Sequence, residues 1–97
     1  MLSIINQIWE IQVKSAANGY DGIQRNLRRL ESELSELGFT VIDPLGRLYK
    51  ETDTDIEATI STRLDGDSKV VKVLKPIVYQ MENGQNILVQ KGITIVE

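Results

Sequence analysis

Residues 20–38 read YDGIQRNLRRLESELSELG, and this stretch decides the first half of the fold. Its apolar residues are separated by alternating steps of three and four, the heptad spacing of a helix that packs along one narrow seam. Charged residues occupy the other faces, and Arg29 and Glu33 are one i,i+4 pair. Gly38 ends the predicted helix, because glycine readily adopts the left-handed conformation found after a helix C-terminus. The seam consists of Tyr20, Ile23, Leu27, Leu30, Leu34 and Leu37.

A first helix is expected upstream of this seam. The apolar residues between Ile4 and Val13 cover a wide helical face. Asn18 and Gly19 then supply a stop, because both residues tolerate the left-handed conformation. The first 38 residues therefore predict a helical hairpin.

Beyond Gly38 the apolar period changes to two, which is typical of strands. Asp43-Pro44-Leu45-Gly46 predicts a turn, and Asp65-Gly66 and Asn83-Gly84 are hairpin signals, the second of them the strongest in the chain. Pro76 cannot donate a ladder hydrogen bond, so it marks an edge, a bulge or a strand boundary. The expected strands are residues 39–42, 56–64, 70–81, 87–89 and 93–96.

The chain is thus helical first and all-β afterwards, which is the α+β class. We divide it into a helical dimerisation region, residues 1–38, and a small all-β domain of short strands, residues 39–97. An apolar seam on an isolated helical hairpin can be covered by a second copy or by the β part. Because the seam is long, narrow and strictly periodic, we favour a dimeric four-helix bundle.

The composition excludes several kinds of functional site. The 97 residues include no Cys and no His, which removes disulfides, Cys/His zinc sites and His-based catalytic triads. A net charge of -3 argues against binding to duplex nucleic acid. Asp53, Asp55 and Glu57 alternate, but they lack the glycine and the closing glutamate of a calcium loop. We therefore expect a protein that is not an enzyme and needs no metal or cofactor.

The N-terminal segment does not read as a membrane or targeting signal. Residues 2–13 are rich in apolar side chains but fall short of the ~20 residues that span a bilayer. A signal peptide has Lys or Arg before its apolar segment, and no Lys or Arg precedes residues 2–13. Together with the lack of Cys, this pattern predicts a cytoplasmic protein that does not bind membranes.

Several motifs occur in a characteristic order along residues 20–96. They are Tyr20-Asp-Gly-Ile23, the heptad leucines, Leu37-Gly-Phe-Thr-Val-Ile-Asp-Pro-Leu-Gly46, Val70-Val-Lys-Val-Leu-Lys-Pro76, Tyr79, Asn83-Gly84 and Ile93-Thr-Ile-Val96. This order resembles the GrpE family of nucleotide exchange factors. The resemblance implies a homodimer built on a four-helix bundle, with a β wing on each protomer. One wing would insert into the nucleotide-binding domain of a DnaK-type heat-shock chaperone and open its cleft, so that ADP leaves.

The resemblance also implies the residues that bind each partner. The dimer interface would be the heptad residues Tyr20, Ile23, Leu27, Leu30, Leu34 and Leu37. The chaperone-binding residues would be Gly22 in the helix, Lys75, Tyr79 and Gln85 near the wing hairpin, and Val96 on the last strand. For Gly22 two interpretations stay open, a turn residue at the helix start or a site where another backbone comes close.

The chain departs from the family pattern at several points, among them Lys91-Gly92 where the family tends to have a proline. It lacks the long helical stalk, it has Thr54-Asp-Ile-Glu57-Ala58 where the family has a histidine-containing signature, and Gln85 stands where a basic residue commonly follows the wing turn. These departures leave an alternative of a different class, a dimeric adaptor that keeps the fold without exchange activity. A further alternative is a portion of a longer exchange factor.

Overall fold

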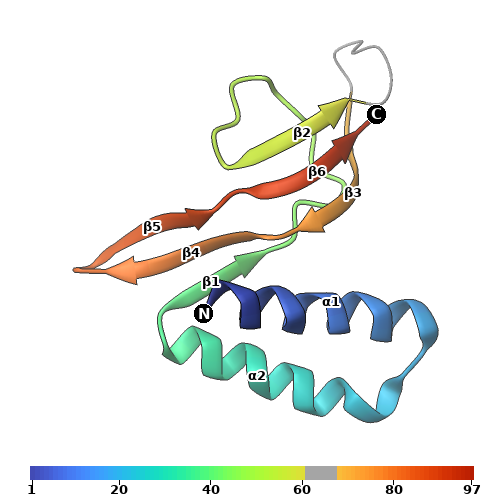
Figure 1. Cartoon of the computed structure of the whole chain (residues 1–97), viewed down its shortest axis with the longest axis vertical. Helices are drawn as coiled ribbons and strands as arrows, with labels where there is room; N and C mark the ends of the chain where they lie inside the picture. The colour runs from blue at the N-terminus through green and yellow to red at the C-terminus, as the bar shows by residue number, and fades with distance from the viewer. Residues whose placement is uncertain (61–67) are drawn as a thin grey trace. The chain divides into compact units, whose positions relative to one another are not determined.

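The computed structural model describes residues 1–60 and 68–97 and has two α-helices and two small sheets. The α+β class expected from the sequence is therefore confirmed. The chain divides into two compact units, Met1–Thr40 and Val41–Glu97 (Figure 1). The division falls inside β1, Phe39–Ile42, the strand that directly follows Gly38.

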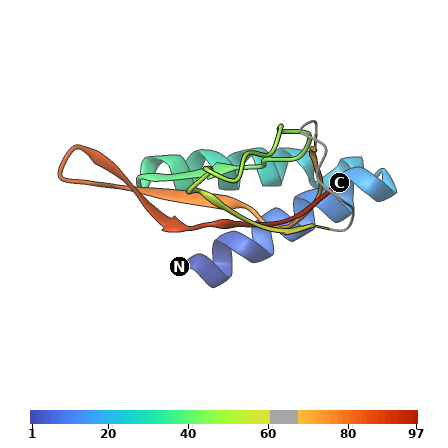
Figure 2. The same ribbon diagram turned by 90° about the horizontal axis from the view of Figure 1, so that it is seen from above.

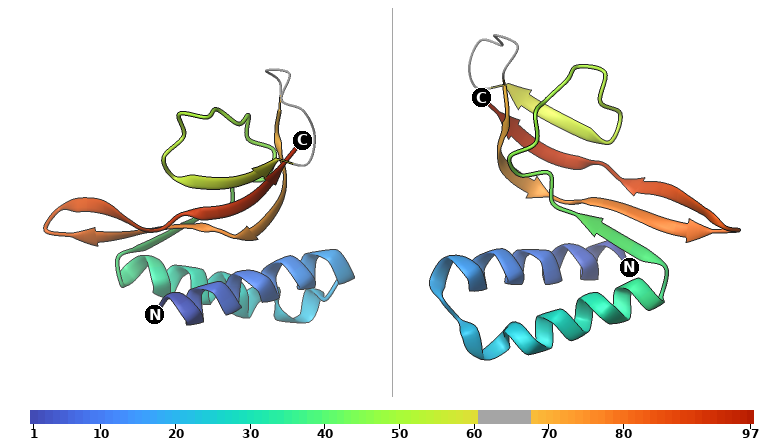
Figure 3. Two further views of the ribbon diagram at one scale, coloured as in Figure 1. Left: turned by 45° about the horizontal axis from the view of Figure 1, so that its top comes forward. Right: turned by 180° about the vertical axis from the view of Figure 1, so that it is seen from behind.

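The first unit is a helical hairpin of α1, Leu2–Asn18, and α2, Gln24–Glu36, which run side by side in opposite directions (Figures 1 and 3). Both predicted stops are confirmed, because Gly19 and Gly38 have positive φ angles of 67° and 88°. Two side-chain hydrogen bonds join the helices. Gln24 Nε2 donates to Ser15 Oγ at 2.7 Å, and Gln12 Nε2 donates to Glu31 Oε1.

The heptad seam is divided between the inside and the outside of this hairpin. Leu27 and Leu34 are buried, with 4% and 7% of their surface exposed. Leu30 and Leu37 remain 41% and 61% exposed, and Ile23 is exposed as well. Tyr20 is not helical, which corrects the prediction, because a 3₁₀ turn of residues Asp21–Ile23 precedes α2. A second copy therefore has only part of the seam available to it.

The second unit contains two three-stranded sheets. Their orders are β1-β4-β5 and β2-β6-β3. The strands are β2 Ile56–Ile60, β3 Val70–Lys75, β4 Ile77–Glu82, β5 Gln85–Gln90 and β6 Gly92–Val96. β2 runs parallel to β6, with Ile56 opposite Gly92, whereas β3 runs antiparallel to β6. The parallel pair is a feature that the sequence did not predict.

A long two-stranded ribbon connects the two sheets. β3 leads into β4 and β5 leads into β6, so β3–β6 and β4–β5 are consecutive pairs of one ribbon (Figure 1). Pro76 interrupts one side of the ribbon, which confirms it as a strand boundary, and Lys91 interrupts the other. Gln90 Nε2 donates to the carbonyl oxygen of Pro76 at 2.8 Å and joins the two sides at this point. The tip of β4–β5 and the C-terminal end of β6 lie at opposite ends of the unit (Figure 2).

The hydrophobic core of the second unit is formed mainly by aliphatic side chains. Its buried members are Ile56, Val70, Ile77 and Val96, and Tyr49, Ala58, Val73, Tyr79 and Leu88 pack against them. Thr94 is completely buried, and its hydroxyl donates to the carbonyl oxygen of Glu57 at 3.0 Å, so its polar atom has a partner.

The turns predicted from sequence have mixed outcomes. At the predicted Asp43–Gly46 turn, the amide of Leu45 donates to Asp43 Oδ1 and Gly46 has a φ of 82°. The Asn83-Gly84 hairpin is confirmed between β4 and β5. The Asp65-Gly66 signal and the end of the strand expected over residues 56–64 lie outside the described residues. Across residues 1–60 and 68–97, none of the helices is long and apolar enough to cross a membrane.

Candidate functional site

The β4–β5 hairpin carries the longest run of exposed residues among the described residues of the second unit. Asn83 and Gly84 form its two-residue turn, with φ angles of 49° and 79°. Two positive φ angles are typical of a type I′ turn, which matches the right-handed twist of the flanking strands. All residues from 81 to 87 are exposed. The hairpin therefore offers its tip and both strand ends to a partner.

The three candidate residues near this hairpin do not form one cluster. Gln85 is exposed beside the turn, opposite Glu82. Tyr79 lies opposite Leu88 and packs against the core, so only part of its ring is accessible. Lys75 is exposed at the end of β3, opposite Ile93 of β6. Lys75 is seven positions from Glu82, the partner of Gln85, which is about 23 Å at ~3.3 Å per residue. A single partner would have to contact much of the ribbon to reach all three.

Val96 is a correction to the predicted surface. The sequence reasoning placed it among the chaperone-binding residues, yet its side chain is 0% exposed and belongs to the core. It lies opposite both Ile60 of β2 and Val70 of β3, because β6 is the central strand of its sheet. In a central strand, the alternating residues that face the core become buried, as Val96 does here. The periodicity of β6 alone does not reveal that this strand is central.

Gly22 lies in the 3₁₀ turn before α2, and not within the helix. Its φ is outside the left-handed region, and an added Cβ would meet nothing within 4 Å. The structure therefore places Gly22 at the helix start, where neither backbone conformation nor a close neighbour within the protomer requires glycine.

The helical hairpin carries a second candidate surface, an apolar face that both helices supply. Ile4 and Ile8 of α1 come one position before the buried Ile5 and Trp9, and the exposed Leu30 of α2 and Leu37 just after it come three positions after Leu27 and Leu34. At ~100° per residue, one position back is a rotation of about −100°, and three positions forward is about 300°, which is equivalent to about −60°. Both offsets are therefore rotations in the same sense about the helix axis. Two antiparallel helices that face each other therefore turn both sets toward the same side. This apolar face consists of Ile4, Ile8, Ile11, Ile23, Leu30 and Leu37, of which all but the half-buried Ile8 are exposed.

Sequence reasoning missed the contribution of α1 to this face. The apolar residues of α1 are numerous and surround much of the helix, so they do not reveal which of them face α2. The heptad on α2 was the visible signal, and the hairpin geometry adds Ile4, Ile8 and Ile11 to it.

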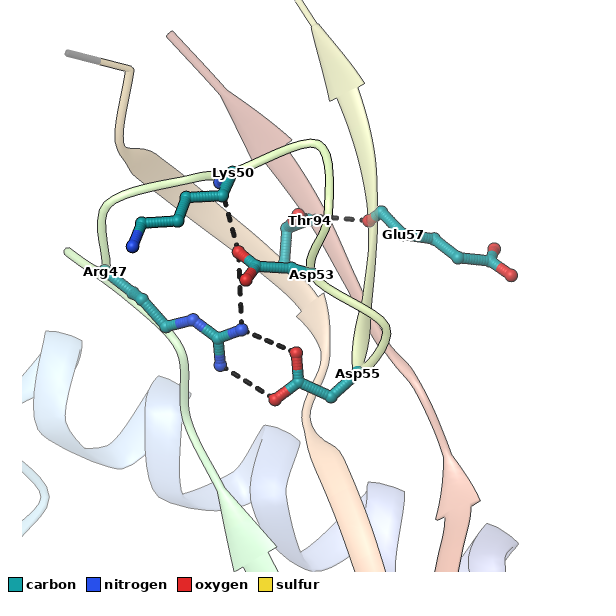
Figure 4. A network of polar contacts seen from close by, with 6 residues as sticks. All are labelled: Arg47, Lys50, Asp53, Asp55, Glu57 and Thr94. Carbon is teal, nitrogen blue, oxygen red and sulfur yellow. Dashed lines mark hydrogen bonds and ion pairs between the residues drawn. The ribbon is translucent and has the colours of Figure 1, made fainter. Parts of the chain in front are cut away.

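An ion-pair network fixes the loop between β1 and β2 (Figure 4). The Arg47 guanidinium donates to both carboxylate oxygens of Asp55, at 2.9 and 2.5 Å, and Nη2 lies 3.5 Å from Asp53 Oδ2. Asp53 also accepts a hydrogen bond from the backbone N–H of Lys50. The backbone of Arg47 pairs with Val70, so the loop is tied to the first strand of the ribbon. These contacts give Asp53 and Asp55 a structural role, which sequence reasoning did not assign.

The bidentate contact alters the acidity of Asp55. The hydrogen bonds from Arg47 favour the carboxylate and hold the pKa of Asp55 below its ordinary value, while partial burial opposes this effect. The same contact raises the pKa of Arg47. A group whose pKa is lowered on folding stabilises the protein above its unfolded pKa, and this contribution disappears as the pH falls through the folded value.

We expect Asp55→Asn to lower the free energy of unfolding by about 1 kcal/mol at pH 7, because a partly buried bidentate pair is lost. The difference from wild type should begin to shrink as the pH falls below about 4, the ordinary pKa of aspartate, and should disappear below the lowered pKa of the folded Asp55 carboxyl. Urea unfolding at a series of pH values measures this. Glu57→Gln is a matched control, since the exposed Glu57 carboxylate points away from the network (Figure 4). Equal pH profiles for the two variants would contradict the role of the pair.

The described parts of the chain contain no group of three or more Asp and Glu side chains placed to hold a metal ion. What these residues offer is contact surface: an exposed hairpin tip on one unit and an apolar helical face on the other. Comparison with known proteins adds nothing to this picture, since no family model, no curated protein and no solved structure matches the chain.

Proposed function

We propose that this protein is a GrpE-like nucleotide exchange factor, which binds the nucleotide-binding domain of a cytoplasmic DnaK-type chaperone and promotes release of ADP. The observation that carries the proposal is the β4–β5 hairpin, whose residues 81–87 are all exposed at the end of a ribbon anchored in the β core. An exposed hairpin that extends from a packed core suits insertion into the cleft of another protein. The resemblance of residues 20–96 to the family supplies the identity of that partner.

The mechanism would be differential binding without chemistry. The hairpin would bind the open, nucleotide-free chaperone more tightly than the closed, ADP-bound form. By linkage, ADP and the exchange factor then weaken each other's binding by the same factor. Each tenfold weakening of ADP requires about 1.4 kcal/mol of preference for the open form.

The apolar helical face supports the dimeric part of the proposal. A face supplied by both helices of a hairpin is the arrangement from which two hairpins form a four-helix bundle. The buried Leu27 and Leu34 would hold each hairpin together, and the exposed Leu30 and Leu37 would meet the second copy.

The test is release of fluorescent ADP from the DnaK-type chaperone of the same cell, in stopped flow. We expect wild-type protein to accelerate release weakly and Gln85→Arg to accelerate it further, because the variant restores a basic side chain at the exposed tip. Gln7→Arg adds the same charge at an exposed position of α1 and should match wild type. Unchanged release with both wild type and Gln85→Arg would overturn the exchange activity.

Two observations favour the alternative, a dimeric adaptor without exchange activity. Of the residues that the resemblance assigns to the chaperone, Val96 is buried and Gln85 lacks the usual charge. The adaptor interpretation retains the helical dimer and assigns the hairpin to another protein. It would be supported if the chain dimerises while ADP release stays unchanged.

A further inference from the structure

The outer edge of β5 is unlike the other long edge of the ribbon. β5 is the end strand of the sheet β1-β4-β5, and β3 is the end strand of the sheet β2-β6-β3. β3 carries the exposed Lys72 and Lys75, the exposed Lys69 directly precedes it, and two register shifts interrupt its pairing, against one in the β4–β5 pair. Lysines and irregularities of this kind prevent an edge from pairing with other chains. Residues 85–90 of β5 read QNILVQ, with no charge, no proline and no glycine.

The geometry of the turn determines which backbone groups of β5 point outward. In a hairpin with a two-residue turn, the flanking residues Glu82 and Gln85 exchange hydrogen bonds. The pairs then alternate, so Ile87 also directs its N–H and C=O groups toward Gln80 of β4. Asn86 and Leu88, between these pairs, direct theirs toward the open edge. Every second residue of a strand directs its N–H and C=O groups to the same neighbour, so Asn86 and Leu88 can pair with one further strand.

We propose that this edge pairs with β5 of a second copy of the chain, antiparallel, about a two-fold axis at Ile87. In that register Asn86 of each copy exchanges hydrogen bonds with Leu88 of the other, which pairs all the outward groups of both residues. The two Ile87 side chains meet at the axis, and each is 39% exposed in the single chain. The inference goes beyond the proposed exchange function. It occupies an edge of the same hairpin, so two paired copies would separate there before the hairpin enters a cleft, and it uses a different surface from the helical face.

Self-pairing is favoured over an unrelated peptide by the charges at the two ends of β5. The strand itself carries no charge that would oppose its own copy. Just beyond it, the exposed Lys91 would lie beside the Asn83-Gly84 turn of the copy, next to the exposed Glu82. The two-fold axis repeats this opposite-charge contact, so both ends of the pairing are complementary.

A single cysteine at Ile87 tests the register, since the chain has no native Cys. Across the axis Ile87 is a non-hydrogen-bonded pair with Cα atoms about 4.5 Å apart, within the range for a disulfide. The matched control is Gln85→Cys, exposed on the same face of the same strand. Its two copies would be separated by four residues, about 13 Å, which no disulfide bridges.

We expect Ile87→Cys to form covalent dimers at least tenfold faster than Gln85→Cys under mild oxidation, measured on non-reducing gels. The ratio of the two rates is the readout, because association through the helical face sets no register between two β5 strands. Similar rates, or a faster Gln85→Cys, would overturn the register. Failure of both to cross-link would exclude a second copy as the occupant of the edge. None of these outcomes depends on whether the chain releases ADP.

Discussion

Gly92→Ala is expected to destabilise the β unit by roughly 1–3 kcal/mol, the usual cost of an extra carbon in a filled core. A Cβ at this position would lie 2.9 Å from Ile77 Cγ1, 3.3 Å from Ile56 Cγ2 and 3.5 Å from the carbonyl oxygen of Lys75. Ile77 is 0% exposed and Ile56 is 5% exposed, so neither side chain has room to move away. The backbone is held as well, because the Gly92 amide donates to the carbonyl of Asp55.

Gly92→Ala is expected to destabilise the protein because the added Cβ lacks room, and not because alanine cannot adopt the backbone conformation of Gly92. The φ of Gly92 is not in the left-handed region, so alanine could adopt the same conformation. Without the clash, Gly→Ala would stabilise the protein by about 0.4–1 kcal/mol, because alanine lowers the conformational entropy of the unfolded chain. Gly22→Ala supplies this case as a control, because a Cβ there meets nothing within 4 Å.

Urea unfolding of both variants makes the comparison direct. We expect a lower midpoint than wild type for Gly92→Ala and an unchanged or slightly higher midpoint for Gly22→Ala. A Gly92→Ala midpoint equal to that of Gly22→Ala would mean that Ile77 and Ile56 yield without cost. A higher urea midpoint for Gly22→Ala would not test the proposed contact of Gly22 with a chaperone. That contact is tested by a separate binding titration.

The features that sequence predicted correctly are local ones. Gly19 and Gly38 end helices through their own backbone conformations, and Asn83-Gly84 closes a hairpin in the same way. Pro76 marks a strand boundary because its ring removes one N–H donor. Each of these residues acts through its own φ angle or its own missing group, so no knowledge of distant partners is needed.

The features that sequence did not predict depend on distant segments. β2 pairs with β6 in parallel across more than thirty residues, and this pairing makes β6 central and buries Val96. Gly92 leaves no room for a Cβ, because Ile56 and Ile77 approach it from two other strands. The pairing of Arg47 with Asp55 joins two ends of a loop that reads as solvated.

The candidate site shows the same division. The exposure of Lys75 and Gln85 agrees with the surface role predicted for them, whereas Tyr79 is half-buried against the core. The heptad on α2 predicts one apolar seam, but periodicity does not reveal how a seam is shared between an internal and an external neighbour. In the structure Leu27 and Leu34 are inside the hairpin, and Ile23, Leu30 and Leu37 are outside.

This split decides how self-association through the helical face should be tested. Leu34 is 7% exposed, so a charged residue there would disrupt the hairpin itself and abolish dimers for an uninformative reason. Leu30 and Leu37 are 41% and 61% exposed, and lysine at either position leaves the buried pair intact. The informative variant is therefore Leu30→Lys combined with Leu37→Lys.

We expect wild-type protein to be dimeric at tens of micromolar and the double variant to be monomeric. Burial of a leucine contributes about 1.5–3 kcal/mol, and roughly half of each side chain remains to be buried on association, so each contributes about 1 kcal/mol. Four leucines in the symmetric dimer then contribute about 4 kcal/mol, close to a thousandfold in the dissociation constant. Sedimentation equilibrium measures this change directly.

The control carries the same two added charges away from the apolar face. Val13 on the other side of α1 and Val71 on β3 are each 45% exposed, and Val13→Lys combined with Val71→Lys should remain dimeric. A monomeric wild type at these concentrations would contradict the dimer altogether. If both double variants dissociate equally, net charge and not the helical face controls association. If neither dissociates while Ile87→Cys still cross-links rapidly, the β5 edge holds the copies together in place of the four-helix bundle.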